Sequence, residues 1–372
     1  MTTIDELLDE RHIIVCTGSG GVGKTTTSAA LALRAAERGR RTIVCTIDPA
    51  KRLAQSLGLS ELDNTPHRVP LEIGGRGELW AMMLDMKSTF DSMVLEMTTP
   101  ERARAIFANP FYRHVSQTLS GTQEYMAMQK LWELHEEGRW ELIIIDTPPT
   151  RSALDFLDAP RRLIDFLEGR FLRLMLWPYM KAGRTGLRVL NVGTRVLLKT
   201  MTRITGSDLI ADVAGFFQQF EGMYASFKAR AARVRELLGA RRTAFVVVAT
   251  PTEPSMREAK FFAERLTTER MPLGGVVVNR THTVPAVPGL EDPAALAERA
   301  GDAAALRASL EAFAAWREVS AREERIIAGA LRYAGAAPIW RVPDLSDDVH
   351  DLDALRAIGA LLAGEEPVPA IP

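Results

Sequence analysis

The sequence contains very little cysteine, which limits the redox and metal chemistry that the protein can perform. Cys16 and Cys45 are the only two in 372 residues, and both lie within apolar stretches, where a cysteine acts as a small buried hydrophobic side chain. Their wide separation rules out a CxxC metal site. A disulfide between two adjacent strands is the remaining alternative, although so few cysteines favour a reducing compartment.

The sequence also lacks an excess of charge and a long hydrophobic run. Lys and Arg total 46 against 47 Asp and Glu, so no overall positive field favours nucleic acid as a partner. No charge-free apolar run approaches the roughly 20 residues of a membrane span. The first residues, MTTIDELLDERHIIV, are acidic and lack the basic-then-apolar order of a signal peptide. We therefore expect a cytoplasmic protein and leave open a peripheral association with a membrane.

What the sequence does contain is a series of short β-branched runs that alternate with helical stretches. They occupy residues 13–18, 42–48, 79–85, 140–146, 243–250, 274–279 and 338–343. The runs are apolar on both faces, as expected for strands of a parallel sheet that helices cover on both sides. The pattern predicts an α/β fold with a doubly wound, mostly parallel sheet, and the 47% of hydrophobic residues is enough for a sizeable core.

Two of the gaps between these strands are too long for simple crossovers. Residues 87–139 and 151–242 are rich in Leu, Met, Phe, Ala and Arg at helical spacing. We expect them to form a helical subdomain that is inserted into one nucleotide-binding domain spanning residues 1–372. Residues 289–334 are Ala-rich and amphipathic, which predicts at least two surface helices before the last strand.

The segment GSGGVGKT, residues 18–25, satisfies the GxxxxGK[ST] pattern of a phosphate-binding loop. It follows a predicted strand and opens a predicted helix, which makes a chance Gly-rich turn the weaker interpretation. The backbone N–H groups of such a loop and the helix N-terminus surround phosphates. We expect Lys24 to contact the β and γ phosphates of ATP and the hydroxyl of Thr25 to bind Mg²⁺. The predicted ATP-binding residues of the loop are Gly20, Gly21, Val22, Gly23, Lys24, Thr25 and Thr26.

Asp48 and Asp146 each end an apolar strand, which places both at the carboxyl edge of the sheet beside the phosphate-binding loop. Asp146 suits the role of holding Mg²⁺, and Asp48 suits orienting or deprotonating the attacking water while lying within reach of the metal. The alternative is that each caps the following helix. Asn279 ends the GGVVVN run and either hydrogen-bonds the adenine or caps a turn. The six histidines show no metal-ligand spacing.

Five segments in this order resemble the ArsA and tail-anchored-protein-targeting ATPases over nearly the whole chain. They are GxGGVGKTTT, DPAKRL at Asp48, GTQEYMAM at Gly121, DTPPTRSALDFL at Asp146 and PLGGVVVNR at Pro272. The resemblance implies a SIMIBI-class P-loop ATPase that dimerises face to face over two nucleotides. It also implies that Asp48 activates water, that the segment from Asp146 couples hydrolysis to movement of the helical subdomain, and that Asn279 contacts the base.

The sequence departs from that family in ways that bear on its partners. The family loop reads GKGGVGKT, with a lysine that reaches the partner's phosphates across the dimer, whereas this chain has Ser19. The residues after Asn279 contain no cysteine, which disfavours the zinc site of the eukaryotic members, and neither cysteine suits metalloid binding. The resemblance is strongest to an actinobacterial branch with paired ArsA-like chains. We therefore expect either a homodimer or a heterodimer with an ArsA-like paralogue that carries the lysine.

Three functions remain for such a switch. Residues 160–227 combine Leu, Met, Phe and Trp with many cations, so they form either an ordinary packed core or a groove for a hydrophobic protein segment or a membrane surface. Capture or transfer of such a segment is the first function, and driving an anion transporter is the second. A positioning switch of the MinD/ParA type ranks last because the C-terminal residues are acidic.

Overall fold

The computed structural model describes residues 2–47, 52–71, 75–113, 122–148, 212, 215–216, 219, 223–284, 287–300, 303–332, 335, 337–345 and 348–365. The chain divides into two compact units. The first comprises Met1–Met83, Gly138–Ala153 and Leu238–Pro372. The second comprises Leu84–Glu137 and Leu154–Leu237.

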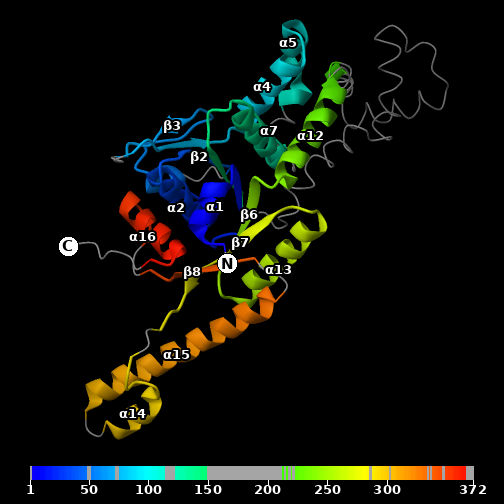
Figure 1. The fold of residues 1–372 in the computed structure, drawn as a ribbon. Coiled ribbons are helices and arrows are strands. Elements are labelled where there is room, and N and C mark those ends of the chain that lie inside the picture. The colour runs from blue at the N-terminus through cyan, green and yellow to red at the C-terminus, as the bar shows by residue number, and fades with distance from the viewer. Residues whose placement is uncertain are drawn as a thin grey trace, which may run out of the picture. The chain divides into compact units, whose positions relative to one another are not determined.

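An eight-stranded sheet forms the centre of the first unit, in the order β3-β4-β2-β5-β1-β6-β7-β8 among the residues described (Figure 1). The strands are β1 (Ile13–Thr17), β2 (Arg41–Thr46), β3 (His67–Arg68), β4 (Glu78–Met83), β5 (Leu142–Asp146), β6 (Thr243–Ala249), β7 (Leu273–Thr281) and β8 (Ile339–Pro343). Neighbouring strands are parallel except for β3 and β4. The predicted α/β fold with a mostly parallel sheet is therefore confirmed.

Three details of the sheet differ from the sequence-based expectation. The edge strand β3 was not expected, because two residues are too short to give a periodic signal. Strand β7 does not end at Asn279 but continues to Thr281 through a shift in register. The disulfide alternative is excluded, because β5 lies between the two strands that carry the cysteines, and both cysteines are free and buried.

Helices cover both faces of this sheet. Those of the first unit are α1 (Ile4–Glu10), α2 (Lys24–Glu37), α3 (Arg52–Ser56), α13 (Glu253–Thr268), α14 (Pro293–Arg299), α15 (Ala304–Leu331) and α16 (Leu352–Ala363). Helices α1, α2 and α16 share one buried apolar cluster with the sheet. On the opposite face, Phe262 of α13 lies with its ring 6.5 Å from that of Phe245 in β6. Side chains alternate along a strand, so Phe245 and its neighbour Val246 serve different faces.

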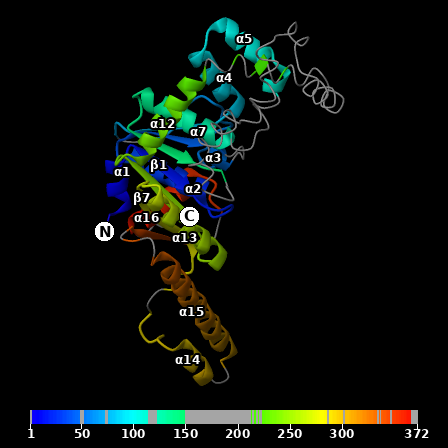
Figure 2. The same cartoon turned by 90° about the vertical axis from the view of Figure 1, so that its right-hand side faces the viewer.

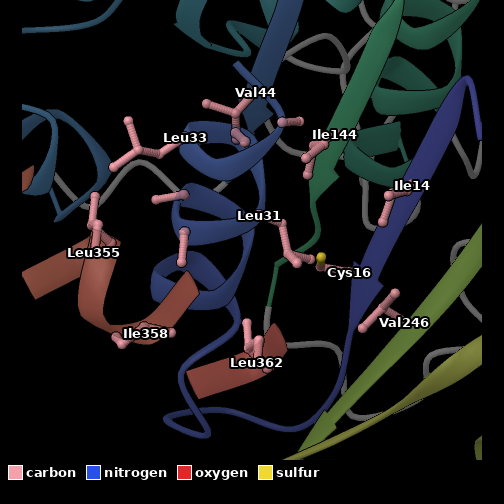
Figure 3. Close-up of a cluster of buried hydrophobic side chains, with 14 of the residues drawn as sticks. Ile14, Cys16, Leu31, Leu33, Val44, Ile144, Val246, Leu355, Ile358 and Leu362 are labelled. Atoms are coloured by element: carbon pink, nitrogen blue, oxygen red, sulfur yellow. The ribbon is translucent and has the colours of Figure 1, made fainter. Parts of the chain in front are cut away.

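The core beneath α2 is packed from strands and helices that are far apart in the sequence. Figure 3 shows Leu31 of α2 beside Cys16 of β1, with Leu355 and Ile358 of α16 on the far side of α2. Leu362 of α16 belongs to the same buried cluster. Burial raises the pKa of the Cys16 thiol to about 12, so it stays protonated at neutral pH. Cys16 is therefore a small apolar side chain of the core, as the sequence indicated.

Between β7 and β8 the chain forms a helical hairpin, in which α14 packs against α15 (Figure 2). This agrees with the two or more helices expected in residues 289–334. Part of the exposed surface of α15 is apolar, including Leu306 and Trp316. Helix α15 also packs against α13.

The second unit is helical where the structure describes it. Its helices are α4 (Met86–Met97), α5 (Pro100–Ala108), α7 (Thr122–Glu136) and most of α12 (Tyr224–Gly239). Aromatic rings pack between them, including Tyr125 of α7, which stacks on Phe227 of α12 at a centroid distance of 5.0 Å. Among the helices described, none has the length and apolar composition needed to cross a membrane. Most of residues 160–227, the segment expected to bind a client, lies outside the described residues.

Candidate nucleotide site

The loop between β1 and α2 fits against the ends of two other strands because two of its residues have no side chain. A Cβ atom on Gly18 would lie 2.1 Å from the carbonyl oxygen of Val248 in β6. A Cβ atom on Gly23 would lie 2.2 Å from Nδ2 of Asn279 in β7. Gly23 also has φ 95° at the N-cap of α2, a left-handed conformation that favours glycine. The GxxxxG spacing therefore matches two close backbone approaches.

Lys24 is the first residue of α2, and its side chain is almost fully buried at 6% exposure. Its Nζ atom donates a hydrogen bond of 2.7 Å to the backbone carbonyl of Ser19, so the side chain folds back over the loop. An ammonium group has three N–H donors. Lys24 can thus keep this bond and still donate to an anion held by the loop.

Asp146 connects three elements at the carboxyl end of β5. Its carboxylate is fully buried, and its Oδ2 atom accepts hydrogen bonds from Oγ1 of Thr25 at 2.7 Å and from Oγ1 of Thr46 at 2.9 Å. Thr25 belongs to α2, and Thr46 lies directly beside Asp146 in the β2–β5 register. Carboxylate and hydroxyl oxygens are ligands that Mg²⁺ prefers, so Thr25 and Asp146 fit the predicted metal site.

Asn279 braces the phosphate-binding loop from the side of β7. Its Nδ2 atom donates to the carbonyl of Val22 at 2.9 Å, and its Oδ1 atom accepts from the backbone N–H of Arg280 at 3.0 Å. The sequence analysis offered a turn cap or a base contact for Asn279, and neither interpretation includes this contact with the loop. The amide group has a second N–H, which leaves a donor for a ligand.

These groups border one cavity of about 1010 Å³ at the carboxyl edge of the sheet. Six of the residues that the sequence analysis assigns to nucleotide binding line it: Gly21, Gly23, Lys24, Thr25, Thr26 and Asn279. Gly20 and Val22 are not among the described lining residues: Gly20 is exposed beside it, and the Val22 side chain is buried in the core. Asp146 lies behind Thr25, to which it is hydrogen-bonded.

Two residues of the predicted site need separate mention. Asp48 lies outside the described residues, and the strand that precedes it ends at Thr46. Ser19 is half-buried, and its hydroxyl oxygen lies 3.5 Å from that of Ser255 in α13. The Ser255 hydroxyl accepts a hydrogen bond from the backbone N–H of Thr250 at 3.0 Å. Ser19 therefore faces the start of α13.

The structure adds residues that the sequence analysis did not assign to the site. Thr46 is one, and the only sequence signal for it is a hydroxyl two positions before Asp48 at the end of a buried strand. Arg52 and Gln55 of α3 also line the cavity, and the far wall is formed by Val342, Pro343 and Leu345 at and just after the end of β8. Pairing between β7 and β8 brings this wall to the loop, and no local sequence pattern encodes it.

Comparison with known proteins identifies the family of the chain. The model of the anion-transporting ATPases, the ArsA ATPase family, matches residues 11–289, which include the loop, Asp146 and Asn279. The chain belongs to this family. An ATPase of the family binds and hydrolyses ATP, and the cavity beside the phosphate-binding loop is the candidate place for that reaction.

Individual relatives are distant and carry two kinds of name. The chain is 27% identical to "ATPase ASNA1 homolog 1" of Paramecium tetraurelia, over 75% of this chain and 78% of that protein. It is 22% identical to "Putative arsenical pump-driving ATPase 1" of Aquifex aeolicus, over 96% and 80%. It is 29% identical to "ATPase GET3" of Malassezia globosa, where the match covers 42% of this chain and less than half, 46%, of that relative.

Replacement of Thr46 tests whether the buried hydrogen bonds to Asp146 support metal binding. In Thr46→Val the carboxylate loses the hydroxyl donor of Thr46, and losing such an orienting partner weakens a metal site about 10- to 100-fold. We expect the Mg²⁺ concentration that half-saturates ATP hydrolysis to rise by about tenfold or more. Thr46→Ser, which keeps the hydroxyl, should stay close to wild type. Urea unfolding that shows a stability loss in Thr46→Val with unchanged Mg²⁺ dependence would limit Thr46 to a structural role.

Proposed function

We propose that the cavity at the carboxyl edge of the sheet binds ATP with its phosphates on the loop between β1 and α2. In this arrangement Lys24 donates to the β and γ phosphates, and the backbone N–H groups from Gly21 to Thr26 surround them. Thr25 and Asp146 hold the Mg²⁺, which neutralises charge that develops on the phosphates. Asp48 follows β2 and accepts the proton of the attacking water. The cluster of Thr25, Thr46 and Asp146 beside Lys24 is the observation that carries this proposal.

We further propose that the nucleotide state of this site controls capture or transfer of a hydrophobic protein segment. The connection runs through the chain itself, because the residues that follow Asp146 and Thr147 lead into the second unit. Thr147 is fixed against β1, since its Oγ1 atom donates to the carbonyl of Cys16 at 2.8 Å. A change in the ligands of Asp146 therefore acts at the point where the chain leaves the sheet. The relatives named GET3 and ASNA1 support this function.

The alternative function is to drive an anion transporter. It is favoured by the description of the family and by the Aquifex relative, which is named as an arsenical pump-driving ATPase. Metalloid binding through cysteine is disfavoured, because Cys16 and Cys45 are buried in the sheet and Cys16 stays protonated. An anion that does not need thiolates remains compatible with this alternative.

An ATP-trapped variant separates the two functions. Asp48→Asn keeps the size of the side chain but cannot accept the proton of water, so we expect ATP to bind and turnover to fall by about 100-fold or more. With MgATP, this variant should co-elute on size exclusion with a soluble carrier protein that bears a C-terminal apolar helix of about 20 residues. The same carrier with three Asp residues in that helix is the matched control and should not co-elute.

Two outcomes of this experiment would contradict the proposal. Co-elution that is independent of ATP, or equal for both carriers, would show that hydrophobic capture is not controlled by the nucleotide. In a separate assay of the wild-type chain, ATP hydrolysis that responds to inorganic anions and to membrane vesicles, but to neither carrier, would favour the transporter function. Leu174→Asp and Met201→Asp, in the segment outside the described residues, should reduce capture of the apolar carrier without changing ATP affinity.

We also propose that the working form is a heterodimer with an ArsA-like paralogue. Ser19 stands where the resemblance implies a lysine that reaches the partner's phosphates, and a hydroxyl can supply neither that reach nor the charge. A homodimer would lack this cation at both sites unless Lys51, Arg52 or Arg280 replaces it. A paralogue with the lysine would complete the site of this chain, which keeps Lys24 and Asp48.

Introducing the missing cation tests the heterodimer proposal. An arginine-finger cation contributes on the order of 10³-fold or more in rate, so Ser19→Lys should raise the ATPase rate of the isolated chain well above wild type. Ser19→Ala is the control and should leave the slow rate unchanged. Phosphate release should be measured over a range of protein concentrations, with light scattering to report assembly. A stable wild-type homodimer with rapid turnover that Ser19→Lys does not change would contradict the proposal.

A further inference from the structure

Arg280 has an unusual backbone conformation at the edge of the candidate nucleotide site. Its φ is 58°, in the left-handed region, and among the described residues only Arg270 shares a positive φ without being glycine. Arg280 lies within β7, where the pairing with β8 shifts in register between Asn279 and Thr281. Such bulges redirect a side chain, and they are common next to active sites.

The residues before Arg280 hold this conformation from the side of the phosphate-binding loop. The Asn279 side chain accepts a hydrogen bond from the Arg280 N–H and donates to the carbonyl of Val22. One amide group thus ties the loop to the left-handed residue. A shift of the loop at Val22 would pull on the same group that fixes Arg280.

The residues after Arg280 hold the conformation from the opposite side. Thr281 donates through Oγ1 to the carbonyl of Val342 at 3.2 Å and accepts at its own carbonyl from the N–H of Asp344 at 3.0 Å. The His282 N–H donates to Oε2 of Glu323 in α15 at 2.8 Å. A strained residue persists when its surroundings over-determine it, and such strain gathers at functional sites.

The result of this arrangement is an exposed arginine side chain that lines the cavity. Its guanidinium makes no hydrogen bond or ion pair with any residue in the part of the chain that the structure describes. The two arginines with the same φ differ here, because Arg270 follows α13 at the opposite end of β7 and is not among the residues found to line the cavity.

The chemistry of the cavity indicates which part of a nucleotide Arg280 would meet. One side carries the polar loop, with Lys24 and Thr25, and suits phosphates. The side beyond Asn279 offers apolar surface from Val342, Pro343 and Leu345, which suits a base, and Asp344 between them also lines the cavity and disfavours a phosphate there. Arg280 belongs to this side, since its neighbour Thr281 pairs with Pro343. A planar guanidinium stacks well on an aromatic ring.

We propose that Arg280 stacks its guanidinium on the base of the bound nucleotide, and that Asn279 and Thr281 hold it in place for this contact. The inference rests on the nucleotide site proposed above and is independent of client capture or dimerisation. It gives the strained residue a role in affinity for the nucleoside part of the ligand. A contact with the phosphates is the competing role, and the two roles predict different ligand dependence.

Calorimetric titration with MgATP, MgADP and inorganic tripolyphosphate distinguishes these roles, because tripolyphosphate has phosphates but no base. Loss of a cation–π contact corresponds to a decrease in affinity of about 3- to 30-fold. Arg280→Ala should therefore lower the affinity for ATP and for ADP by the same factor in this range and leave the affinity for tripolyphosphate unchanged. Arg280→Lys keeps the positive charge but not the planar guanidinium. Its loss of ATP-binding free energy should be more than half of the loss measured for Arg280→Ala. Unchanged ATP affinity, or weaker tripolyphosphate binding in both variants, would overturn the proposal.

Two control variants separate the side chain from the backbone. Arg280→Gly adopts the left-handed conformation without strain, so its nucleotide affinity should match that of Arg280→Ala while its thermal midpoint is higher. Arg270→Ala removes the other left-handed arginine and should leave ATP affinity at the wild-type value. Wild-type affinity in Arg280→Gly would show that the backbone, and not the guanidinium, determines binding.

Lys24→Ala distinguishes an error in the proposed nucleotide site from an error in the proposed role of Arg280 alone. If the phosphates lie on the loop, Lys24→Ala should abolish binding of ATP and of tripolyphosphate alike. Normal binding of both ligands to Lys24→Ala would contradict the nucleotide site itself. Lost binding in Lys24→Ala together with unchanged ATP affinity in Arg280→Ala would contradict only the stacking role.

Discussion

The close packing of one loop against two strand ends determines how the rest of the candidate site is arranged. The backbone at Gly18 passes so near the Val248 carbonyl, and that at Gly23 so near Asn279, that neither position has room for a Cβ atom. This fit brings the start of α2 to the carboxyl end of β5, where Thr25 meets Asp146. It also brings Val22 to Asn279, which in turn fixes Arg280. Any displacement of the loop would therefore disturb contacts with three strands, β5, β6 and β7.

Asp146 has a second structural role, because it is a buried carboxylate that depends on its hydroxyl partners. A buried charge without hydrogen bonds is costly, and the hydroxyls of Thr25 and Thr46 offset that cost. Under the proposed binding of Mg²⁺ and phosphates, Thr25 would also contact these ligands, and its hydrogen bond to Asp146 would change. The next residue, Thr147, is anchored to Cys16, and the chain then enters the second unit. Under the proposed function, these contacts would link the nucleotide state to the second unit.

Much of the fold and of the phosphate side could be predicted from the sequence, because both depend on local patterns. Parallel strands buried on two faces give continuous apolar runs, and the loop gives glycines at fixed spacing before Lys24 and Thr25. The short edge strand β3 gave no signal, since two residues show no period. The extension of β7 beyond Asn279 was missed because it depends on pairing with β8.

The far wall of the cavity and the support around Arg280 could not be predicted for the same reason. Val342, Thr281 and Glu323 come together only through strand register and the packing of α15, which are properties of the tertiary structure. Thr46 reaches Asp146 because of the β2–β5 register, and the only mark of this in the TIVCT run is a hydroxyl near the strand end. Sequence patterns thus identified the loop with Lys24 and Thr25, whereas long-range pairing determines which other residues border the cavity.

Amide hydrogen exchange of the full chain with and without MgATP tests most directly whether these elements form one nucleotide site. The account predicts that MgATP slows exchange in three separate segments at once: the loop at residues 18–26, the end of β7 at residues 279–282 and the end of β8 at residues 342–345. Residues 259–268 of α13, beyond the contact of Ser255 with Ser19, serve as the internal reference. Protection confined to the loop, or protection of α13 without the ends of β7 and β8, would contradict the account.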